Sequence, residues 1–144
     1  MAGEKEPQVA AAEYEAQLKQ FFHLDGDALP QFDLVLLGLG EDGHTASLFP
    51  GSSALDETQR SVATTYVEKL QAHRLTLTFP VINNAAQITF LIAGQSKSAV
   101  VGEILTAENS NLPAARIQPV TGRLTWLITQ DAAGENIGRG PLSD

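Results

Sequence analysis

Residues 32–51, FDLVLLGLGEDGHTASLFPG, join an apolar strand to a glycine-rich turn that carries titratable side chains. Residues 34–37 form an unbroken apolar run, which is typical of a parallel strand that helices cover on both faces. We therefore expect this strand at the centre of the fold, with a neighbouring strand on each side.

The turn after this strand combines backbone freedom with acid–base side chains. Its three glycines are Gly38, Gly40 and Gly43. They allow a sharp turn and a close approach to a ligand, while Glu41, Asp42 and His44 lie between and after them. Because ligands of open α/β sheets bind at the carboxyl ends of the strands, this turn predicts a ligand site.

The composition is typical of a soluble globular protein. The chain has 144 residues, of which 43% are hydrophobic and 18% charged, and this length predicts one domain. Its net charge of −8 argues against nonspecific binding to nucleic acid or to anionic membranes. The sequence contains no cysteine, no apolar run of membrane-spanning length and no apolar signal-peptide core, so we expect a soluble cytoplasmic protein.

The rest of the chain alternates helices with short strands. We expect an amphipathic helix over residues 9–22 that packs on the sheet, and a loop over residues 23–31. Further strands are expected over residues 61–66, 74–79, 87–93 and 124–129. A helix is expected from residue 97 to about 106, short helical turns over residues 80–86 and 130–133, and a loop over residues 109–119.

This alternation predicts an α/β protein with three αβα layers and a mostly parallel sheet. Residues 1–144 are expected to form a single domain, with flexible segments over residues 1–8 and 134–144.

The glycine turn has two alternative interpretations. The spacing Gly-x-Gly-x-x-Gly also occurs in dinucleotide-binding sites, and Asp56 lies near the position of their ribose-binding acid. Glu41 and Asp42 argue against this interpretation, because they place carboxylates where a pyrophosphate should meet backbone amides. A purely structural turn leaves the clustering of Asp42 and His44 unexplained.

Asp42 and His44 are the candidate catalytic pair. Their two-residue spacing lets both lean into one cleft, where a carboxylate would hold one imidazole nitrogen and the other nitrogen would take a proton from water. The sequence leaves open whether the two side chains touch. His23 and His73 lie in other settings without a close histidine, so we expect no metal site.

A second candidate site is basic. Ser96 is expected to cap a helix that begins near Lys97, so that free backbone amides and the lysine ammonium face one anion, and Gly94 lets the chain approach it. Arg74, at the start of a neighbouring strand, would add a planar guanidinium for phosphate oxygens. The alternative for each residue alone is a solvated surface charge.

Five segments of the chain resemble, in order, 6-phosphogluconolactonases of the glucosamine/galactosamine-6-phosphate isomerase superfamily. They are GLGEDGHTASLFPG (38–51), RLTLTFPVINNA (74–85), FLIAGQSKSAVVGEIL (90–105), LPAARIQP (112–119) and LTWLITQDAA (124–133). The resemblance implies hydrolysis of 6-phosphogluconolactone to 6-phosphogluconate in the oxidative pentose phosphate pathway, without a metal or organic cofactor.

The resemblance also implies roles for individual residues. It makes His44 the general base that activates water, with Asp42 beside it, and makes Arg74 and Lys97 ligands of the substrate phosphate. Glucosamine-6-phosphate deaminases are similar through the Asp-Gly-His core, but their run has a functional glutamate just before the proline, where this chain has Phe49. This difference favours the lactonase, because ester hydrolysis needs only an activated water and charge stabilisation at the carbonyl. A noncatalytic fragment that binds sugar phosphates is the remaining alternative.

One departure from the family affects the whole fold. Its members carry an N-terminal portion, with additional strands and a glycine-serine-threonine phosphate loop, that has no counterpart in these residues. The resemblance therefore implies an incomplete version of the family fold. We expect an exposed apolar sheet edge or face, which self-association or a complementing N-terminal portion would cover.

Overall fold

The computed structural model describes residues 4–107 and 110–134 of the chain. Its helices and strands are α1 (Pro7–Phe21), β1 (Val35–Leu37), β2 (Val62–Val67), β3 (Ala72–Leu77), α2 (Phe79–Asn83), β4 (Gln87–Ile92), α3 (Ser98–Thr106), β5 (Arg123–Ile128) and α4 (Gln130–Ala133). Short 3₁₀-helices are η1 (Ser53–Asp56), η2 (Glu68–Leu70), η3 (Gln95–Lys97) and η4 (Pro113–Arg116). The expected loop over residues 109–119 therefore contains a helical turn, η4.

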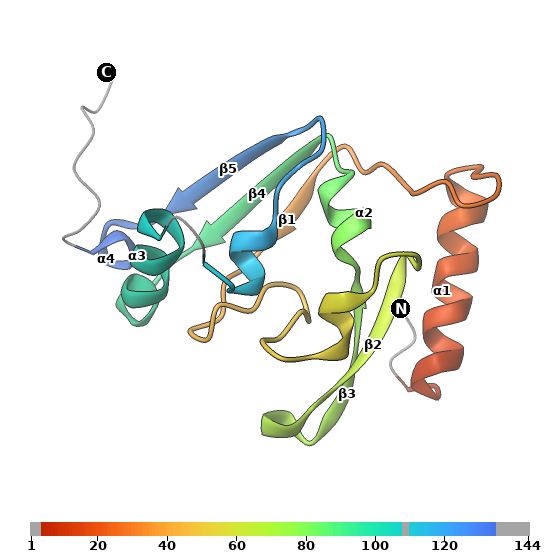
Figure 1. Ribbon diagram of the computed structural model, residues 1–144, viewed down its shortest axis with the longest axis horizontal. Helices are drawn as coiled ribbons and strands as arrows, with labels where there is room; N and C mark the ends of the chain where they lie inside the picture. The colour runs from red at the N-terminus through yellow and green to blue at the C-terminus, as the bar shows by residue number, and fades with distance from the viewer. Residues whose placement is uncertain (1–3, 108–109, 135–144) are drawn as a thin grey trace.

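The strands form a parallel sheet and a separate hairpin. The parallel sheet has the order β1-β4-β5, with Leu37 opposite Phe90 and Phe90 opposite Trp126. β2 and β3 pair antiparallel instead of joining this sheet, because residues 68–71 between them are too few for a parallel crossover. Figure 1 shows the hairpin running away from the three parallel strands. The prediction of an α/β fold with a mostly parallel sheet is confirmed.

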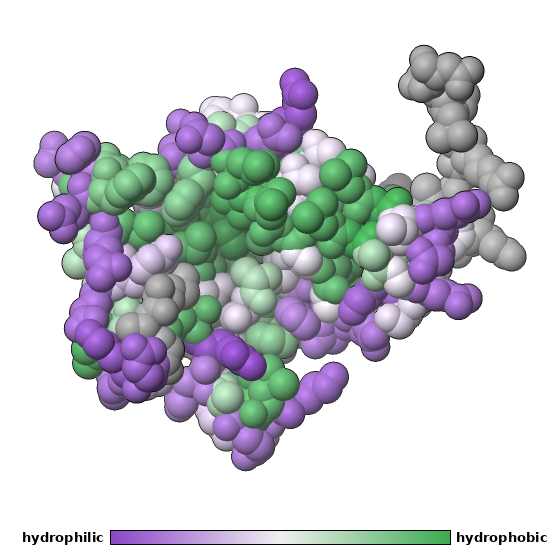
Figure 2. Space-filling model, turned by 180° about the vertical axis from the view of Figure 1, so that it is seen from behind, coloured by the Kyte–Doolittle hydropathy of each residue, from purple (hydrophilic) through white to green (hydrophobic). Residues whose placement is uncertain are grey.

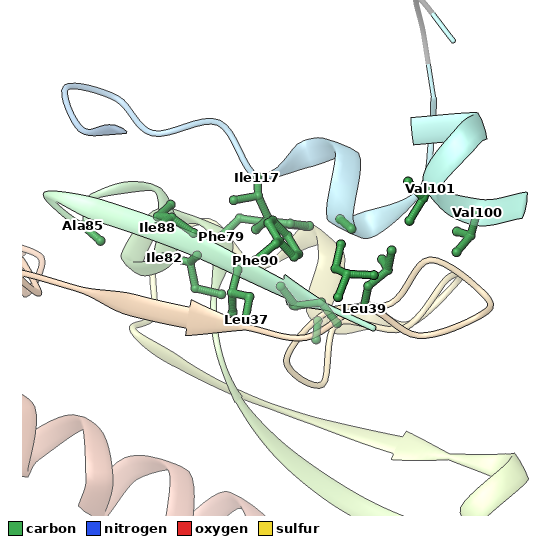
Figure 3. Close-up of a cluster of buried hydrophobic side chains, with 14 of the residues drawn as sticks. Leu37, Leu39, Phe79, Ile82, Ala85, Ile88, Phe90, Val100, Val101 and Ile117 are labelled. Carbon is green, nitrogen blue, oxygen red and sulfur yellow. The ribbon is translucent and has the colours of Figure 1, made fainter. Parts of the chain in front are cut away.

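The hydrophobic core lies on one face of the parallel sheet. Phe90, in the middle strand, is fully buried and stacks on Trp126 with ring centroids 4.0 Å apart. The same cluster contains side chains from β1, β4, α2 and α3 and Ile117, which follows η4 (Figure 3): Leu37, Ile82, Ile88, Val100, Val101 and Ile117. Ala114 of η4 also belongs to it. Strand β1 is thus fixed by this core through Leu37, directly before the glycine turn.

Helix α1 packs on the β2–β3 hairpin, and the expectation that it packs on the parallel sheet is wrong (Figure 1). Its buried Leu18 belongs to a cluster with Val62 of β2, while Phe21 is 76% exposed. The helix begins at its proline, two residues earlier than expected, because a first-position proline is preset for a helix and the Glu6 carboxylate accepts the Val9 N–H at 2.9 Å. The hairpin offers an apolar surface that the sequence pattern did not reveal.

The opposite face of the parallel sheet is open. Alternate residues of a strand point to opposite faces, so Leu37 enters the core while Leu36 points away from it. Four leucines on this far face are half exposed: Leu34 (50%), Leu36 (58%), Leu91 (50%) and Leu127 (54%). Figure 2 shows the resulting hydrophobic surface.

The expected placement of β1 needs correction. Within the described residues β1 pairs only with β4, so it is an edge strand and not a central one. Its unbroken apolar run predicts cover on both faces, but the second helical layer of the expected αβα arrangement is not found among these residues. Within the described residues, one face of the parallel sheet is covered and the other is open.

Two further expectations concern flexible ends of the chain and the lack of a membrane-spanning segment. Residues 1–3 and 135–144, in the segments expected to be flexible, lie outside the described residues, and Pro7 and Gln8 of the first segment belong to α1. No helix within residues 4–107 and 110–134 is both long enough and apolar enough to span a membrane.

Candidate active site

The glycine turn folds back on itself at the carboxyl end of β1. The Gly40 N–H donates to the His44 carbonyl at 2.8 Å, and the Gly43 N–H donates to the Gly40 carbonyl at 3.0 Å. Gly43 has φ +79°, a left-handed conformation that glycine adopts without strain. The Gly43 carbonyl also accepts the Ala114 N–H at 3.0 Å, which ties the turn to η4. The turn is therefore a closed and anchored loop.

This loop brings Asp42 and His44 into direct contact. Asp42 Oδ1 lies 2.5 Å from His44 Nδ1 and also accepts the His44 backbone N–H at 3.2 Å. Partial burial raises the pKa of Asp42, but the hydrogen bonds from His44 and the charge of its ring outweigh that effect and leave the pKa below its ordinary value. Asp42 is thus a carboxylate that fixes the orientation of the imidazole.

Gly40 leaves the space in which this pair fits. A Cβ added at Gly40 would lie 2.0 Å from His44 Nδ1 and 2.6 Å from Asp42 Oδ1, so any larger residue would displace the pair. A Cβ at Gly38 would meet no atom within 4 Å, and the contribution of Gly38 is its carbonyl, which accepts the Thr45 hydroxyl at 2.8 Å. Gly40 therefore provides space for the pair, Gly38 provides a carbonyl acceptor and Gly43 provides the left-handed turn.

Phe49 is a contact of the site that the sequence analysis did not assign. Its ring stacks on the His44 imidazole with centroids 4.2 Å apart and an interplanar angle of 26°. From the sequence, Phe49 marks only the position where deaminases have a glutamate. Its place five residues after His44, within the same loop, is the signal that could have indicated the stacking. The imidazole is held by Asp42 at its edge and by Phe49 on one face.

Lys97 lies at the same edge of the sheet as this pair. Its ammonium is 3.8 Å from the Glu41 carboxylate, because β1 and β4 are parallel neighbours whose carboxyl ends meet there. Gly94 makes the expected turn with φ +100°. Ser96 does not cap a helix: it is exposed within η3, and α3 begins at Ser98 without any side-chain cap. The chain tightens into a 3₁₀ turn first, which moves the start of α3 past Ser96.

Arg74 is exposed in β3, opposite Thr65. Thr76, two residues further along the strand, accepts the Ser47 N–H with its hydroxyl at 3.2 Å. Since alternate residues share one face of a strand, Arg74 lies on the face of β3 that meets the His44 loop. Within the part of the chain that the structure describes, no ion pair or hydrogen bond joins Arg74 to Lys97 or His44. The structure therefore places Lys97 beside Glu41, the residue before Asp42, and places Arg74 on the neighbouring strand β3.

The pair is accessible to solvent, with the His44 side chain 30% exposed and the Asp42 side chain 47% exposed. Neither residue lines the hollows at β1–β3, at η1–α2–η4 or at the carboxyl ends of β4 and β5. No group of three or more metal-ligating side chains is found among the described residues. The chemistry that this arrangement can perform is proton transfer by an oriented imidazole, next to a lysine ammonium.

Comparisons with known proteins show the family of the chain. The family of glucosamine-6-phosphate isomerases and 6-phosphogluconolactonases matches residues 1–126. A 6-phosphogluconolactonase of Rattus norvegicus is 46% identical over 125 residues, covering 86% of this chain and 48% of the rat protein. The structure of the 6-phosphogluconolactonase from Trypanosoma brucei matches with a TM-score of 0.77 at 33% identity, over 88% of this chain and 52% of that one.

A more distant match is a monomeric glucosamine-6-phosphate deaminase, with a TM-score of 0.66 at 25% identity over 90% of this chain and 55% of that one. The chain thus spans about half the length of the relatives it matches. With a family match over residues 1–126, this chain belongs to the glucosamine-6-phosphate isomerase/6-phosphogluconolactonase family.

Proposed function

We propose that this chain catalyses the hydrolysis of 6-phosphogluconolactone to 6-phosphogluconate. The observation that carries the proposal is the hydrogen bond of 2.5 Å between His44 Nδ1 and Asp42, on a loop at the carboxyl end of β1. The identity of 46% to the rat 6-phosphogluconolactonase supports the choice of substrate. The bond uses Nδ1, so Nε2 is left to accept a proton from water.

In the proposed mechanism His44 acts as general base and then as general acid. Nε2 takes a proton from a water molecule as its oxygen attacks the lactone carbonyl carbon, which forms a tetrahedral intermediate. The imidazolium then gives that proton to the ring oxygen as the ester bond breaks, and the open acid leaves. Asp42 stabilises the imidazolium, because its lowered pKa keeps it ionised at neutral pH.

Lys97 is the central phosphate ligand in this proposal. Its ammonium already lies 3.8 Å from a carboxylate, Glu41, which marks a position where an anionic group is accepted. Ser96, exposed one residue earlier, would donate its hydroxyl, and Arg74 would add its guanidinium from β3. The open surface around these groups fits a pocket that further polypeptide completes, either a second copy or an N-terminal portion.

Phe49 argues against the deaminase as the alternative. A deaminase needs a carboxylate for ring opening at this position, and here an aromatic ring stacks on the catalytic imidazole instead. Phe49 thereby orients the His44 imidazole, and it supplies no carboxylate beside Asp42.

Product analysis tests the proposed reaction. Freshly generated 6-phosphogluconolactone is mixed with the chain, and acid release is followed against the spontaneous rate in the same buffer. Glucosamine 6-phosphate is offered in parallel, with ammonia release as its measure. We expect acid release above the spontaneous rate and no ammonia. Ammonia release, or lactone hydrolysis no faster than the spontaneous rate, would overturn the proposal.

A further inference from the structure

Arg116, in η4, links two segments that are far apart in the chain. Its guanidinium Nη2 donates to the Leu55 carbonyl of η1 at 3.0 Å. The guanidinium carbon also lies 4.4 Å from the centre of the Phe79 ring, which is buried at the start of α2. The Arg116 carbonyl accepts the side-chain N–H of Asn83, further along α2, at 3.3 Å. Because a hydrogen bond and a cation–π contact hold the guanidinium together, Arg116 is a fixed link between α2 and η1 and not a mobile surface charge.

A series of hydrogen bonds leads from Leu55 back to the candidate catalytic histidine. The Leu55 N–H donates to the Ser52 carbonyl at 3.1 Å, and the Ser52 N–H donates to the Phe49 carbonyl at 3.1 Å. The Phe49 ring in turn stacks on the His44 imidazole, with centroids 4.2 Å apart. The two turns follow each other directly, so a displacement of the Leu55 carbonyl moves the backbone that carries the Phe49 ring.

The same 3₁₀-helix, η4, holds the chain on the other side of the histidine. The Ala114 N–H donates to the Gly43 carbonyl at 3.0 Å. Helix η4 therefore fixes the chain on both sides of His44, at Gly43 through its backbone and at Leu55 through Arg116. Any residue except proline can supply the backbone bond, whereas the bond to Leu55 needs a long side chain with an N–H donor at position 116.

We propose that Arg116 is a positioning residue of the active site, which holds the Phe49 ring against the His44 imidazole. Among the described residues it makes no hydrogen bond with the imidazole, so it acts through η1 and the two turns. Leu48, which is fully buried, anchors the backbone at one point, and the hydrogen bonds that end at Arg116 set the course of residues 49–52 after it. The effect on turnover rests on the proposed role of His44 as base, whereas the effect on the position of the ring does not.

NMR spectra of Arg116→Met test the proposal without an activity assay. Methionine keeps an apolar side chain over the Phe79 ring but has no N–H to donate to Leu55. The imidazole signals of His44 should move in this variant, because a stacked aromatic ring shifts the signals of the group that it covers and the stack would be loosened. The signals of His23 and His73 should stay unchanged and serve as internal references.

Hydrogen exchange measures the two turns directly. The amides of Ser52 and Leu55 should exchange faster in Arg116→Met, because the bond that ends the series is lost. Arg123→Met is the matched control: it removes the same charge from an exposed position at the start of β5 and should leave the exchange and the histidine signals unchanged. If Arg116→Met does not fold, Arg116→Gln replaces it, since glutamine is shorter than arginine and does not reach the position of Nη2.

A double-mutant cycle tests whether Arg116 acts through Phe49. We expect Arg116→Met to lower kcat for lactone hydrolysis about tenfold and to leave KM nearly unchanged, because the base is displaced while the proposed phosphate ligands are not. In a Phe49→Leu background the same change should lower kcat by less than about twofold, since the ring through which Arg116 acts is already absent.

Two results would overturn the proposal. One is a folded Arg116→Met in which the His44 signals and the exchange of the Ser52 and Leu55 amides are unchanged. The other is a loss of kcat that is the same with and without the Phe49 ring, which would show that Arg116 acts by another route. Absence of lactone hydrolysis in the unmodified chain would instead overturn the proposed reaction, and the NMR and exchange measurements would still decide whether Arg116 holds the Phe49 ring.

Discussion

Gly40 controls the position of the His44 ring. A Cβ at this position would lie 2.0 Å from Nδ1, so Gly40→Ala must push the imidazole away from Asp42. We expect kcat to fall about 10²-fold, since a displacement of about 1 Å in a catalytic group has an effect of that order. Imidazole NMR signals should shift in this variant. In Gly38→Ala, where the added methyl meets no atom within 4 Å, they should stay unchanged. Full activity in Gly40→Ala would show that catalysis does not depend on this position of the His44 ring.

Asp42 links the site to stability at acid pH. Its pKa is lowered from an ordinary value of 3.8, with His44 as the favourable partner, so its ionised form is preferred in the folded state. This contribution to the free energy of unfolding is complete above the unfolded pKa and is lost as the pH falls through the lower folded pKa.

Asp42→Asn should therefore lose less stability than the unmodified chain as the pH falls from about 5 to 3. Urea unfolding at several pH values in this range measures the difference in slope. Parallel curves for the two proteins would contradict the assignment of the lowered pKa to the folded state. At neutral pH the same variant should hydrolyse the lactone more slowly, because an amide cannot stabilise the imidazolium.

The turn after β4 and the strand β3 supply the proposed phosphate ligands. Lys97→Ala and Arg74→Ala should weaken 6-phosphogluconate far more than gluconate, because a charge-assisted hydrogen bond to phosphate is lost. The larger effect is expected for Lys97, which lies beside Glu41, than for Arg74 at the margin of the site. Lys19→Ala is the control, because Lys19 forms its ion pair within α1. Calorimetric titration gives the ratio of the two affinities; an unchanged ratio in both variants would make these residues ordinary surface charges.

The elements themselves were largely predictable from the sequence. The runs that became β4 and β5 were placed within one residue, because apolar runs bounded by glycine and polar residues are strong local signals. The packing of α1 on the hairpin was not predictable, since it depends on a hydrophobic cluster that joins Leu18 and Val62, which lie far apart in the chain. The start of α3 was also placed within one residue, but the 3₁₀ turn before it was not predicted, because a 3₁₀ turn and an α-helix have the same local pattern.

In the molecule as a whole, the apolar run of β1 gave a prediction that the described residues do not fulfil. The pattern of residues 34–37 correctly indicates a strand that needs cover on both faces, but periodicity cannot tell which polypeptide provides the cover. The same limit applies to the site. Its sequence spacing placed Asp42 beside His44, whereas their direct contact and the stacking of Phe49 required coordinates. The contacts of the site arise between residues that are close in the sequence, whereas the cover of β1 does not.

The central claim is that His44 is the base that drives lactone hydrolysis, and the rate of 6-phosphogluconolactone hydrolysis by His44→Ala tests it most directly. His23→Asn is the matched control, because His23 lies in the loop after α1 with φ 53°, a conformation that asparagine tolerates. Both variants are assayed beside the unmodified chain, after circular dichroism has established that they fold. We predict that His44→Ala lowers the rate by about 10²- to 10⁴-fold and that His23→Asn leaves it unchanged. An undiminished rate in His44→Ala would contradict the account.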